Sequence, residues 1–330
     1  MLPSTAVTTM PTGERPRRTR KKQPEPELFA PAPAGHKVLV AGATGFVGKA
    51  VVKELLARGY QVVAVARKLP KAPPREGLLR VAADVSSPGW ERWAEGCTAA
   101  IHLVGIIREN LKAGVTFHRA HVEATARLLE ACRRLGIQRY LHMSAAGAKL
   151  GGLTPYHRTK AEAEELVRAS NLAWTIFRPS VIFGPGDGFT TTLAQVVGRF
   201  PIVPVFGDGS YPLQPVAVEE VAQAFVESLE KPEAVHQVIE LGGPEVLSYL
   251  EVLQRVARSL GKKRIFLRVP LGLARFGVRL AAAVLANPPI TLDELTMLIS
   301  GNRADNTLAR ELFGLPNKRF TGVFQASGAV

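Results

Sequence analysis

The stretch KVLVAGATGFVG, from Lys37 to Gly48, joins a short apolar strand pattern to three spaced glycines and the start of a helical pattern. Gly42 allows the tight turn off the strand, and Gly45 lets the backbone approach a pyrophosphate. Gly48 lets the new helix pack closely on the sheet. Because the first N–H groups of such a helix have no partner within it, they can face an anion. We therefore predict a dinucleotide-binding loop formed by Gly42, Thr44, Gly45, Phe46, Val47 and Gly48.

Strand and helix patterns alternate after this loop. We predict further strands at 61–66, 79–82, 99–104, 139–143 and 174–177, and helices at about 116–135 and 155–169. This alternation favours an α/β fold with a doubly wound, parallel, Rossmann-type sheet. We expect the dinucleotide-binding domain to cover 36–183, with later segments returning to it. A smaller C-terminal substrate domain is expected to cover mainly 184–330.

The composition of the chain is that of a globular protein with an excess of positive charge. Its 330 residues are 46% hydrophobic, and 42 basic against 28 acidic residues give a formal net charge of +14. Cys97 and Cys132 lack metal-ligand spacing, so we expect no disulfide and no metal site, in a reducing, cytoplasmic compartment. No apolar run reaches the ~20 residues that span a bilayer. Four histidines lack a ligand pattern and are assigned no chemistry: His102, His118, His121 and His142.

The first 35 residues differ from the rest. They are rich in proline and carry a basic run formed by Arg15, Arg17, Arg18, Arg20, Lys21 and Lys22. We interpret them as a solvated, disordered tail, because the prolines break the amphipathic helix of a transit peptide and no apolar segment suggests a secretory signal. Electrostatic attachment of the tail to anionic lipid or nucleic acid is the alternative.

Two cations follow the second predicted strand. Arg67 and Lys68 stand where an NAD-specific fold usually carries a carboxylate for the adenosine ribose. A guanidinium can hold a 2′-phosphate through a bidentate, charge-assisted pair. We therefore expect a preference for NADP(H), with NAD(H) as the alternative. If the pair binds nothing, it is a solvated strand end.

The ends of the next two strands complete the predicted nucleotide site. Asp84 and Val85 close the third strand, where a carboxylate could accept a hydrogen bond from the adenine amino group. Leu103, Val104 and Gly105 end the fourth strand and would pass close to the adenosine and the pyrophosphate.

A second group of residues has the pattern of an acid/base site. Tyr156 and Lys160 lie four residues apart at the head of a predicted helix, which places them on one face. A nearby ammonium stabilises a phenolate and lowers the pKa of the phenol. Ser144 follows the fifth strand, where its hydroxyl could orient a carbonyl oxygen. Arg178 and Pro179 end the sixth strand, where the backbone could approach the nicotinamide carboxamide.

A family resemblance is carried by six motifs, which are GATGFVG, IHLVGI, SAAGA, YHRTK (156–160), FRPSVIFGPGDGF and QPVAVEEVAQAF. Together they resemble an extended or atypical short-chain dehydrogenase/reductase, over nearly everything from Lys37 onward. The resemblance implies hydride transfer with Tyr156 as acid/base, Lys160 holding ribose hydroxyls and Ser144 steadying the carbonyl.

IHLVGI and PPITLDELTMLISGNRADN are most similar to one branch of that superfamily. This branch contains the nucleotide-binding accessory subunit of respiratory complex I, its bacterial relatives and proteins implicated in ubiquinone biosynthesis. Its complex I members carry NADPH as a structural cofactor without known turnover. The branch therefore implies a non-catalytic alternative.

The C-terminal part combines glycine-rich, apolar and basic segments. We predict a loop at 183–189 over the nicotinamide end and a helix starting near Val218; by resemblance, Gln214 and Pro215 border the substrate pocket. No acidic residue occurs at 252–292. Eight basic residues lie there: Arg255, Arg258, Lys262, Lys263, Arg264, Arg268, Arg275 and Arg279.

An apolar helix is predicted inside this basic stretch, at 269–289. Such a helix suits an anionic membrane surface, or else a substrate-domain helix packed on the core with arginines at its rim. Nucleic acid is disfavoured as a partner, because no recognition-helix or stacking pattern accompanies the basic residues.

These observations predict an NADP(H)-dependent oxidoreductase acting on a small apolar carbonyl substrate that resembles a quinone or an isoprenoid. The first alternative is a non-catalytic NADPH-binding accessory or assembly subunit of a membrane respiratory complex. The second is a nucleotide-sugar epimerase or dehydratase. We expect the protein in the cytoplasm, free or peripheral on the inner face of a membrane.

Overall fold

A computed structural model describes residues 36–285 and 288–323, so the predicted disordered tail at 1–35 lies outside the described residues. Its centre is a seven-stranded sheet in the order β11-β6-β5-β4-β1-β2-β3, with every neighbouring pair parallel. The strands are β1 (Lys37–Ala41), β2 (Gln61–Ala66), β3 (Leu78–Ala82), β4 (Ala99–His102), β5 (Arg139–Met143), β6 (Ala173–Pro179) and β11 (Gln237–Leu241). The predicted α/β fold class is confirmed.

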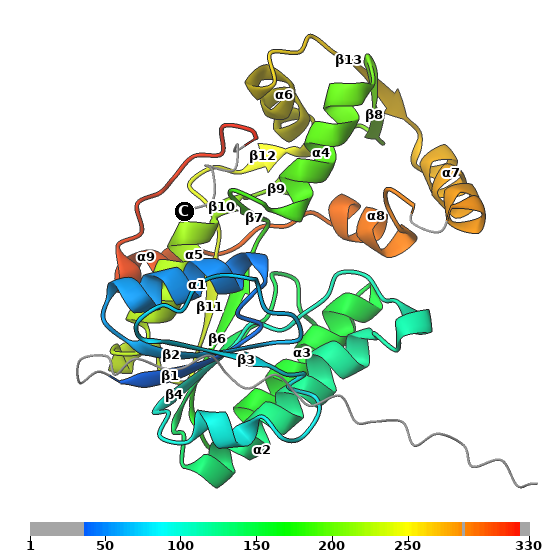
Figure 1. Ribbon diagram of the computed structural model, residues 1–330. Coiled ribbons are helices and arrows are strands. Elements are labelled where there is room, and N and C mark those ends of the chain that lie inside the picture. The colour runs from blue at the N-terminus through cyan, green and yellow to red at the C-terminus, as the bar shows by residue number, and fades with distance from the viewer. Residues whose placement is uncertain (1–35, 286–287, 324–330) are drawn as a thin grey trace, which may run out of the picture.

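Helices cover both faces of this sheet (Figure 1). On one face lie α1 (Phe46–Ala57), α5 (Val218–Glu227) and α9 (Thr307–Phe313). On the other lie α2 (Ala124–Leu135) and α3 (Pro155–Arg168). Alternation along β1 explains the two layers, because Val38 and Val40 face the first cluster while Leu39 and Ala41 face the second. A parallel sheet buried on both faces needs such continuous apolar strands.

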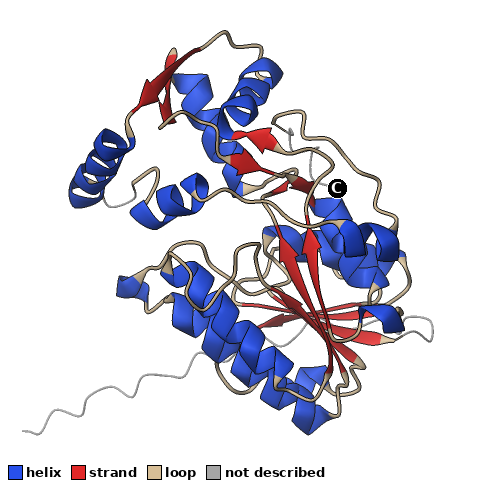
Figure 2. Ribbon diagram, turned by 180° about the vertical axis from the view of Figure 1, so that it is seen from behind, coloured by secondary structure: helices blue, strands red, loops and turns tan. Residues whose placement is uncertain are grey.

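A second lobe lies beyond the carboxyl ends of β6 and β11 (Figure 2). Its helices are α4 (Gly188–Arg199), α6 (Tyr249–Ser259), α7 (Leu271–Val284) and α8 (Leu292–Ile299). Its strands form three pairs: β7 (Ile182–Phe183) with β10 (Val216–Ala217), β9 (Pro212–Leu213) with β12 (Leu247–Ser248), and β8 (Ile202–Phe206) with β13 (Ile265–Val269). Two apolar clusters of its own fill this lobe. The domain boundary predicted near 184 stays a prediction.

Short helical turns complete the described chain. They are η1 (Glu91–Ala94), η2 (Leu111–Ala113), η3 (His118–Glu123) and η4 (Pro232–Ala234). η3 is a π-helix that runs directly into α2, so the helix predicted at about 116–135 changes its hydrogen-bonding pattern on the way.

The structure corrects one predicted segment. The loop expected at 183–189 is partly regular, since Phe183 pairs with Ala217 and α4 begins at Gly188. The glycines of this segment suggest an irregular loop, but Asp187 is the N-cap of α4. Its carboxylate accepts a hydrogen bond from the Thr190 N–H at 2.6 Å, which stabilises the start of the helix. Within residues 36–285 and 288–323, no helix combines the length and the apolar character needed to cross a membrane.

A candidate dinucleotide and acid/base site

The glycine loop has the geometry that its sequence predicts. Gly42 has φ +84°, and a Cβ there would lie 3.0 Å from both Leu103 C and Val104 N on the neighbouring strand end. A Cβ at Gly48 would lie 2.2 Å from Gly42 O. The turn off β1 therefore needs a left-handed residue, and α1 packs against the loop backbone with no room for a side chain at Gly48.

A cleft of about 640 Å³ opens at this loop. Ten of the predicted cofactor residues line it: Gly42, Thr44, Gly45, Arg67, Lys68, Asp84, Val85, Leu103, Val104 and Gly105. They come from the carboxyl ends of β1 to β4, where open parallel sheets bind ligands. Phe46, Val47 and Gly48 belong instead to the first turn of α1 and do not line the cleft. A cleft of this size with a bare glycine turn fits a dinucleotide.

Positive charge gathers at the end of the cleft near β2 and β3. Arg67 and Lys68 are exposed and form no ion pair with any described residue. Arg119, which no sequence pattern marks, lines the same cleft and lies 3.6 Å from the Asp84 carboxylate. Asp84 also accepts hydrogen bonds from Ser86 N at 3.0 Å and Ser86 Oγ at 2.7 Å. Burial raises the pKa of Asp84, but these hydrogen bonds and the nearby arginines outweigh burial and lower it.

Tyr156 lies in the first turn of α3, which begins at the Thr154 cap and Pro155. Its ring meets three other rings edge-on, with centroid distances of 6.0 Å to Phe117, 5.5 Å to His121 and 5.4 Å to His157. Burial raises the pKa of Tyr156 to about 12. The lowering expected from Lys160 does not occur in this structure, because no charge offsets the cost of burying the phenolate. The Tyr156 phenol is therefore protonated at neutral pH.

Lys160 is one helical turn further along α3. Its ammonium donates a hydrogen bond to Met143 O at 2.9 Å, and burial lowers its pKa to about 8 although Glu164 acts in the opposite direction. A Cβ at Gly105 would lie 3.1 Å from Lys160 Nζ. The structure thus brings Lys160 against the strand end that lines the cleft.

Ser144 and Arg178 turn toward a buried carboxylate. The Ser144 hydroxyl donates to Glu164 Oε1 at 2.5 Å, and Arg178 Nε and Nη2 donate to the two Glu164 oxygens at 2.8 and 2.7 Å. Glu164 is fully buried. Neither Ser144, Arg178 nor the buried Pro179 lines the cleft. Their predicted contacts with a substrate carbonyl and a nicotinamide stay predictions, and the bonds in place join α3 to β6.

His121, to which the sequence assigned no chemistry, joins the two halves of the site. Its Nε2 accepts a hydrogen bond from Ile106 N at 3.2 Å, and its Nδ1 lies 2.9 Å from Thr159 Oγ1. Because Nε2 accepts, Nδ1 carries the proton and donates to Thr159. Burial lowers the pKa of His121 to about 2, so the ring is neutral. His121 lies in η3, and π-helical turns are frequent at functional sites. No spacing in the sequence marks it.

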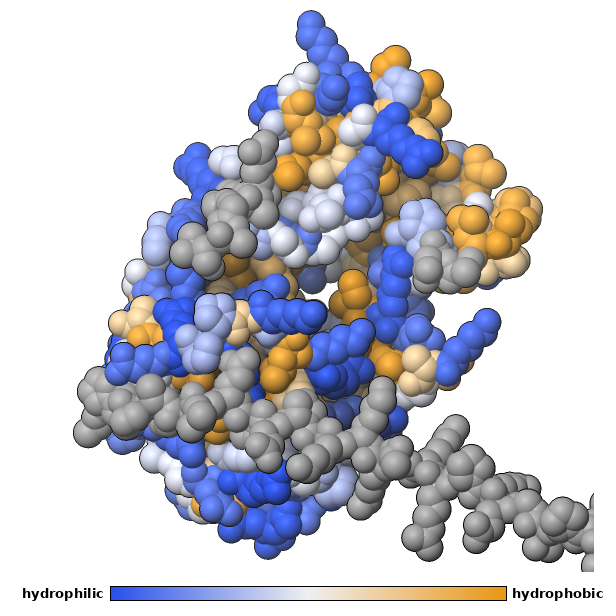
Figure 3. All heavy atoms as spheres, in the orientation of Figure 1, coloured by the Kyte–Doolittle hydropathy of each residue, from blue (hydrophilic) through white to orange (hydrophobic). Residues whose placement is uncertain are grey.

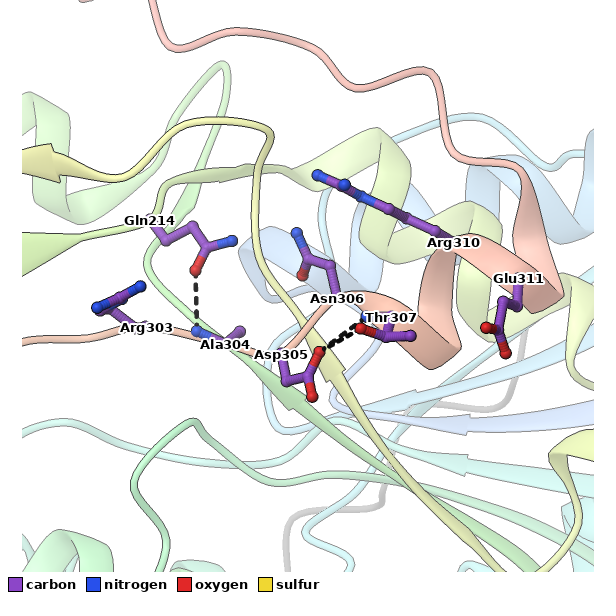
Figure 4. A pocket seen from close by; sticks show the side chains of 8 residues that line it. All are labelled: Gln214, Arg303, Ala304, Asp305, Asn306, Thr307, Arg310 and Glu311. Atoms are coloured by element: carbon purple, nitrogen blue, oxygen red, sulfur yellow. Dashed lines mark hydrogen bonds between the residues drawn. The ribbon is translucent and has the colours of Figure 1, made fainter.

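A second hollow, of about 720 Å³, lies where residues 303–311 pass Gln214 (Figure 4). Gln214 Oε1 accepts from Ala304 N at 3.0 Å, and Gln214 Nε2 donates to Gly243 O at 3.0 Å. Asn306 Nδ2 donates to Gly242 O at 2.7 Å. These hydrogen bonds pair the polar groups of Gln214 and Asn306 with backbone atoms, and they connect residues 303–311 to the segments at Gln214 and Gly242. Neither Tyr156 nor Lys160 lines this hollow.

This chain is similar in sequence to proteins of one known family. Residues 38–242 match the model of the NAD dependent epimerase/dehydratase family. A ceramide reductase of Caulobacter vibrioides is 30% identical over 71% of this chain and 73% of its own length. NADH dehydrogenase [ubiquinone] 1 alpha subcomplex subunit 9 of Arabidopsis thaliana is 28% identical over 86% of this chain and 75% of its own length.

Solved structures show the same fold. The structure of MoeE5 in complex with UDP-glucuronic acid and NAD superimposes with a TM-score of 0.68, covering 87% of this chain and 96% of that one. The two sequences are 23% identical, so this likeness bears on the fold alone.

Proposed function

The chain belongs to the NAD-dependent epimerase/dehydratase family, and from that premise we propose that it is an NADP(H)-dependent oxidoreductase acting on a small apolar carbonyl compound. The membership confirms the predicted resemblance to extended short-chain dehydrogenases, with reductases and a respiratory NADH dehydrogenase subunit among the relatives. One observation carries the proposal: a single cleft combines unpaired cations at the end of β2 with Gly105, against which Lys160 lies.

In this proposal, different residues bind the cofactor and donate the proton. Arg67 and Lys68 would bind the 2′-phosphate, and the bare glycine turn would admit the pyrophosphate. The bound dinucleotide would supply the hydride. Lys160, whose pKa of about 8 leaves it mainly protonated at neutral pH, would hold ribose hydroxyls. Tyr156, protonated because of its pKa of about 12, would donate its phenol proton to the carbonyl oxygen.

The apolar character of the substrate is supported by apolar residues in and near the cleft. Val104, Ile106 and Val115 are among the residues that line it, and Phe117 packs against Tyr156. Apolar side chains of this kind favour an apolar ligand such as a quinone, an isoprenoid or a lipid ketone. The ceramide reductase relative is named for a lipid substrate.

Substituting Tyr156 with phenylalanine tests this function. The change removes the phenol proton but keeps the ring, so NADPH oxidation with apolar quinones, enals and long-chain ketones should fall by about 10²–10⁴-fold. NADPH affinity should stay within about twofold. Tyr211→Phe, a tyrosine of the second lobe, is the matched control. Equal turnover in the Tyr156 and Tyr211 variants would exclude Tyr156 as the proton donor.

A second function, a non-catalytic NADPH-binding subunit, is favoured by one observation. The Ser144 hydroxyl is bonded to Glu164, and buried alanines, Ala145 and Ala146, follow it at the tip of β5. With the Ser144 hydroxyl engaged in this way, the site has one hydrogen-bond donor fewer for a substrate carbonyl oxygen. Its attachment to a respiratory membrane complex is supported by the Arabidopsis relative.

Purification without added nucleotide separates the two functions. The protein is denatured and the released dinucleotide is identified and counted. A stoichiometric amount of NADPH, together with no turnover on the carbonyl panel, would support the bound-cofactor subunit. Reversible NADPH exchange with turnover would support the enzyme. The location that we propose is the cytoplasm, where the free thiols of Cys97 and Cys132 would stay reduced.

A further inference from the structure

The tip of the second lobe carries a large apolar face that no described residue covers. On α7, Leu273, Phe276, Leu280 and Val284 recur every three or four residues and lie on one side of the helix, each 57–75% exposed. The opposite side of α7 is buried through Ala274 and Val278, which pack against Leu295 of α8. The helix is therefore packed as an ordinary surface helix, yet presents a second apolar side outward.

The strand pair before α7 carries further exposed apolar residues. Ile265 pairs with Ile202 and Leu267 pairs with Pro204, so these side chains share one side of the β8–β13 pair. Ile265 and Leu267 are 66% and 56% exposed. The other side of β8 is buried in the core of the lobe through Val203 and Val205. Figure 3 shows hydrophobic residues gathered over this end of the molecule, with hydrophilic residues beside them.

Basic residues predominate around the face. Lys262, Lys263, Arg268, Arg275 and Arg279 are exposed and form no ion pair with any described residue. No acidic residue occurs at 252–292. Two carboxylates lie on neighbouring segments. Asp208 accepts hydrogen bonds from Ser210 at 2.9 and 2.8 Å, and these bonds together with Arg268 lower its pKa. Asp293 lies in the first turn of α8, which packs on α7. The five basic residues outnumber these two carboxylates, so the excess charge is positive.

We propose that this docking face, defined as Ile202, Ile265, Leu267, Leu273, Phe276, Leu280 and Val284, inserts into the surface of an anionic lipid bilayer. The apolar side chains enter the acyl boundary while the surrounding arginines and lysines meet the headgroup phosphates. This choice follows from charge complementarity and from the position of the face. The elements that carry the face, β8, β13 and α7, lie at the outer end of the second lobe, away from the seven-stranded sheet (Figure 1).

Vesicle flotation of the full chain tests the proposal. We use vesicles of phosphatidylcholine with about one third phosphatidylglycerol, and vesicles of phosphatidylcholine alone. The protein should float with the anionic vesicles at low salt. The triple variant Leu273→Ser, Phe276→Ser, Leu280→Ser should bind at least about tenfold more weakly. A matched control removes exposed apolar residues elsewhere, through Leu111→Ser, Leu150→Ser and Leu153→Ser, and should float as the native chain does.

Charge is tested with a second matched pair. Arg268→Gln, Arg275→Gln and Arg279→Gln together should lower anionic vesicle binding roughly hundredfold at low salt. Lys53→Gln, Arg127→Gln and Arg133→Gln remove the same net charge from α1 and α2 and should leave binding within about threefold. Circular dichroism confirms that all variants fold.

Insertion has its own readout. In a Phe276→Trp variant, the tryptophan emission maximum should shift to shorter wavelength with anionic vesicles. It should not shift with phosphatidylcholine alone, because indole emission depends on the water around the ring. Three outcomes overturn the proposal. The native chain could fail to float. Flotation could depend on the basic run at 15–22 and not on the face. The serine triple variant could instead dissolve a dimer seen in solution, which would make the face a contact between copies of this chain.

Discussion

In the proposed function, Arg67 is the residue on which the choice between NADP(H) and NAD(H) depends most directly. It stands exposed at the end of β2 in the cleft and has no ion-pair partner among the described residues. Asp84 is less suitable than Arg67 for a substitution that tests cofactor preference, because its carboxylate already contacts Ser86 and Arg119.

An Arg67→Ser variant should lose about 10–100-fold in NADPH affinity, because a charge-assisted bidentate pair to the 2′-phosphate is removed. NADH affinity should change by less than about twofold, since that cofactor lacks the phosphate. Titration by quenching of protein fluorescence measures both. Lys71→Ser removes an exposed cation outside the cleft and is the control. Equal losses for the two cofactors would contradict the assignment.

Lys160 makes a prediction about stability and pH. Burial lowers its pKa from the usual 10.5 to about 8 in the folded chain. Between about pH 8 and 10.5 the unfolded chain therefore binds more protons at this site, and the contribution of Lys160 to the free energy of unfolding rises with pH. Its full penalty, of up to about 3 kcal/mol, is present below pH 8.

Urea unfolding of the native chain and of Lys160→Met should reveal this penalty. The variant should gain stability relative to the native chain near neutral pH, and that gain should shrink as the pH rises from about 8 to 10.5. Lys53→Met, an exposed lysine of α1, should give a difference that does not change with pH. A difference for Lys160→Met that stays flat over this range would show that its pKa is not lowered.

At the scale of elements, the contact between α1 and the glycine loop decides how the cleft is built. A Cβ at Gly48 would lie 2.2 Å from Gly42 O and 2.8 Å from the Ala43 carbonyl atoms. These neighbours are backbone, so they cannot move aside like the end of a side chain. The loop and the helix must therefore separate before any larger residue fits.

Gly48→Ala should cost about 1–3 kcal/mol in the free energy of unfolding and should weaken dinucleotide binding, because the loop shifts away from α1. Gly198→Ala in α4 is the matched control. A Cβ there meets nothing within 4 Å, so alanine should be neutral or stabilise by about 0.5–1 kcal/mol. Thermal melts and NADPH titrations measure both effects. A Gly48 variant with native stability would show that the loop is free to relax.

Elements with a strong local signal could be predicted from the sequence, and those set by distant contacts could not. β2 and β5 begin and end at the predicted residues, because a charged residue bounds each short apolar run: Arg67 follows β2, and β5 opens on Arg139. β11 was missed. QVIEL is a weak local pattern, and the strand exists because it pairs with β6 from Gln237↔Thr175 onward.

The candidate site divides in the same way. Residues in the glycine loop and at strand ends could be predicted, since topology brings the carboxyl ends of parallel strands together. The partner of Ser144 could not be predicted, because Glu164 lies on another element and is itself paired with Arg168 and Arg178. His121 and Arg119 belong to a π-helical turn that no residue spacing announces.

At the scale of the whole molecule, Arg108 joins the loop after β4 to the second lobe. Its Nε and Nη2 donate to the Glu294 carboxylate of α8, each at 2.6 Å, while Nη1 and Nη2 donate to Pro288 O and Pro289 O, each at 2.9 Å. Arg108 lies just beyond Ile106, which lines the cleft. The loop after β4 and the start of α8 therefore move as a unit while this contact holds.

An Arg108→Gln variant should loosen both segments, at a cost of roughly 1 kcal/mol because the contact is partly exposed to solvent. Hydrogen exchange should accelerate at 105–116 and at 291–299, with β1 and β2 unchanged. Arg134→Gln, which removes the surface pair with Glu91, is the control and should leave both segments protected. Unchanged exchange in the Arg108 variant would mean that the lobes are held elsewhere.

The place of β11 in the sheet has a consequence for the newly made chain. β6 and β11 are neighbours, yet residues 180–236 lie between them and include α4, β8 and α5. A ribosome adding about 5–20 residues per second needs about 3–12 s to cover that distance. During this interval the outer edge of β6 has no partner strand, and such an edge can pair with another chain. The risk of misassembly is therefore concentrated in one short period of synthesis, and slower translation between β6 and β11 would lengthen it.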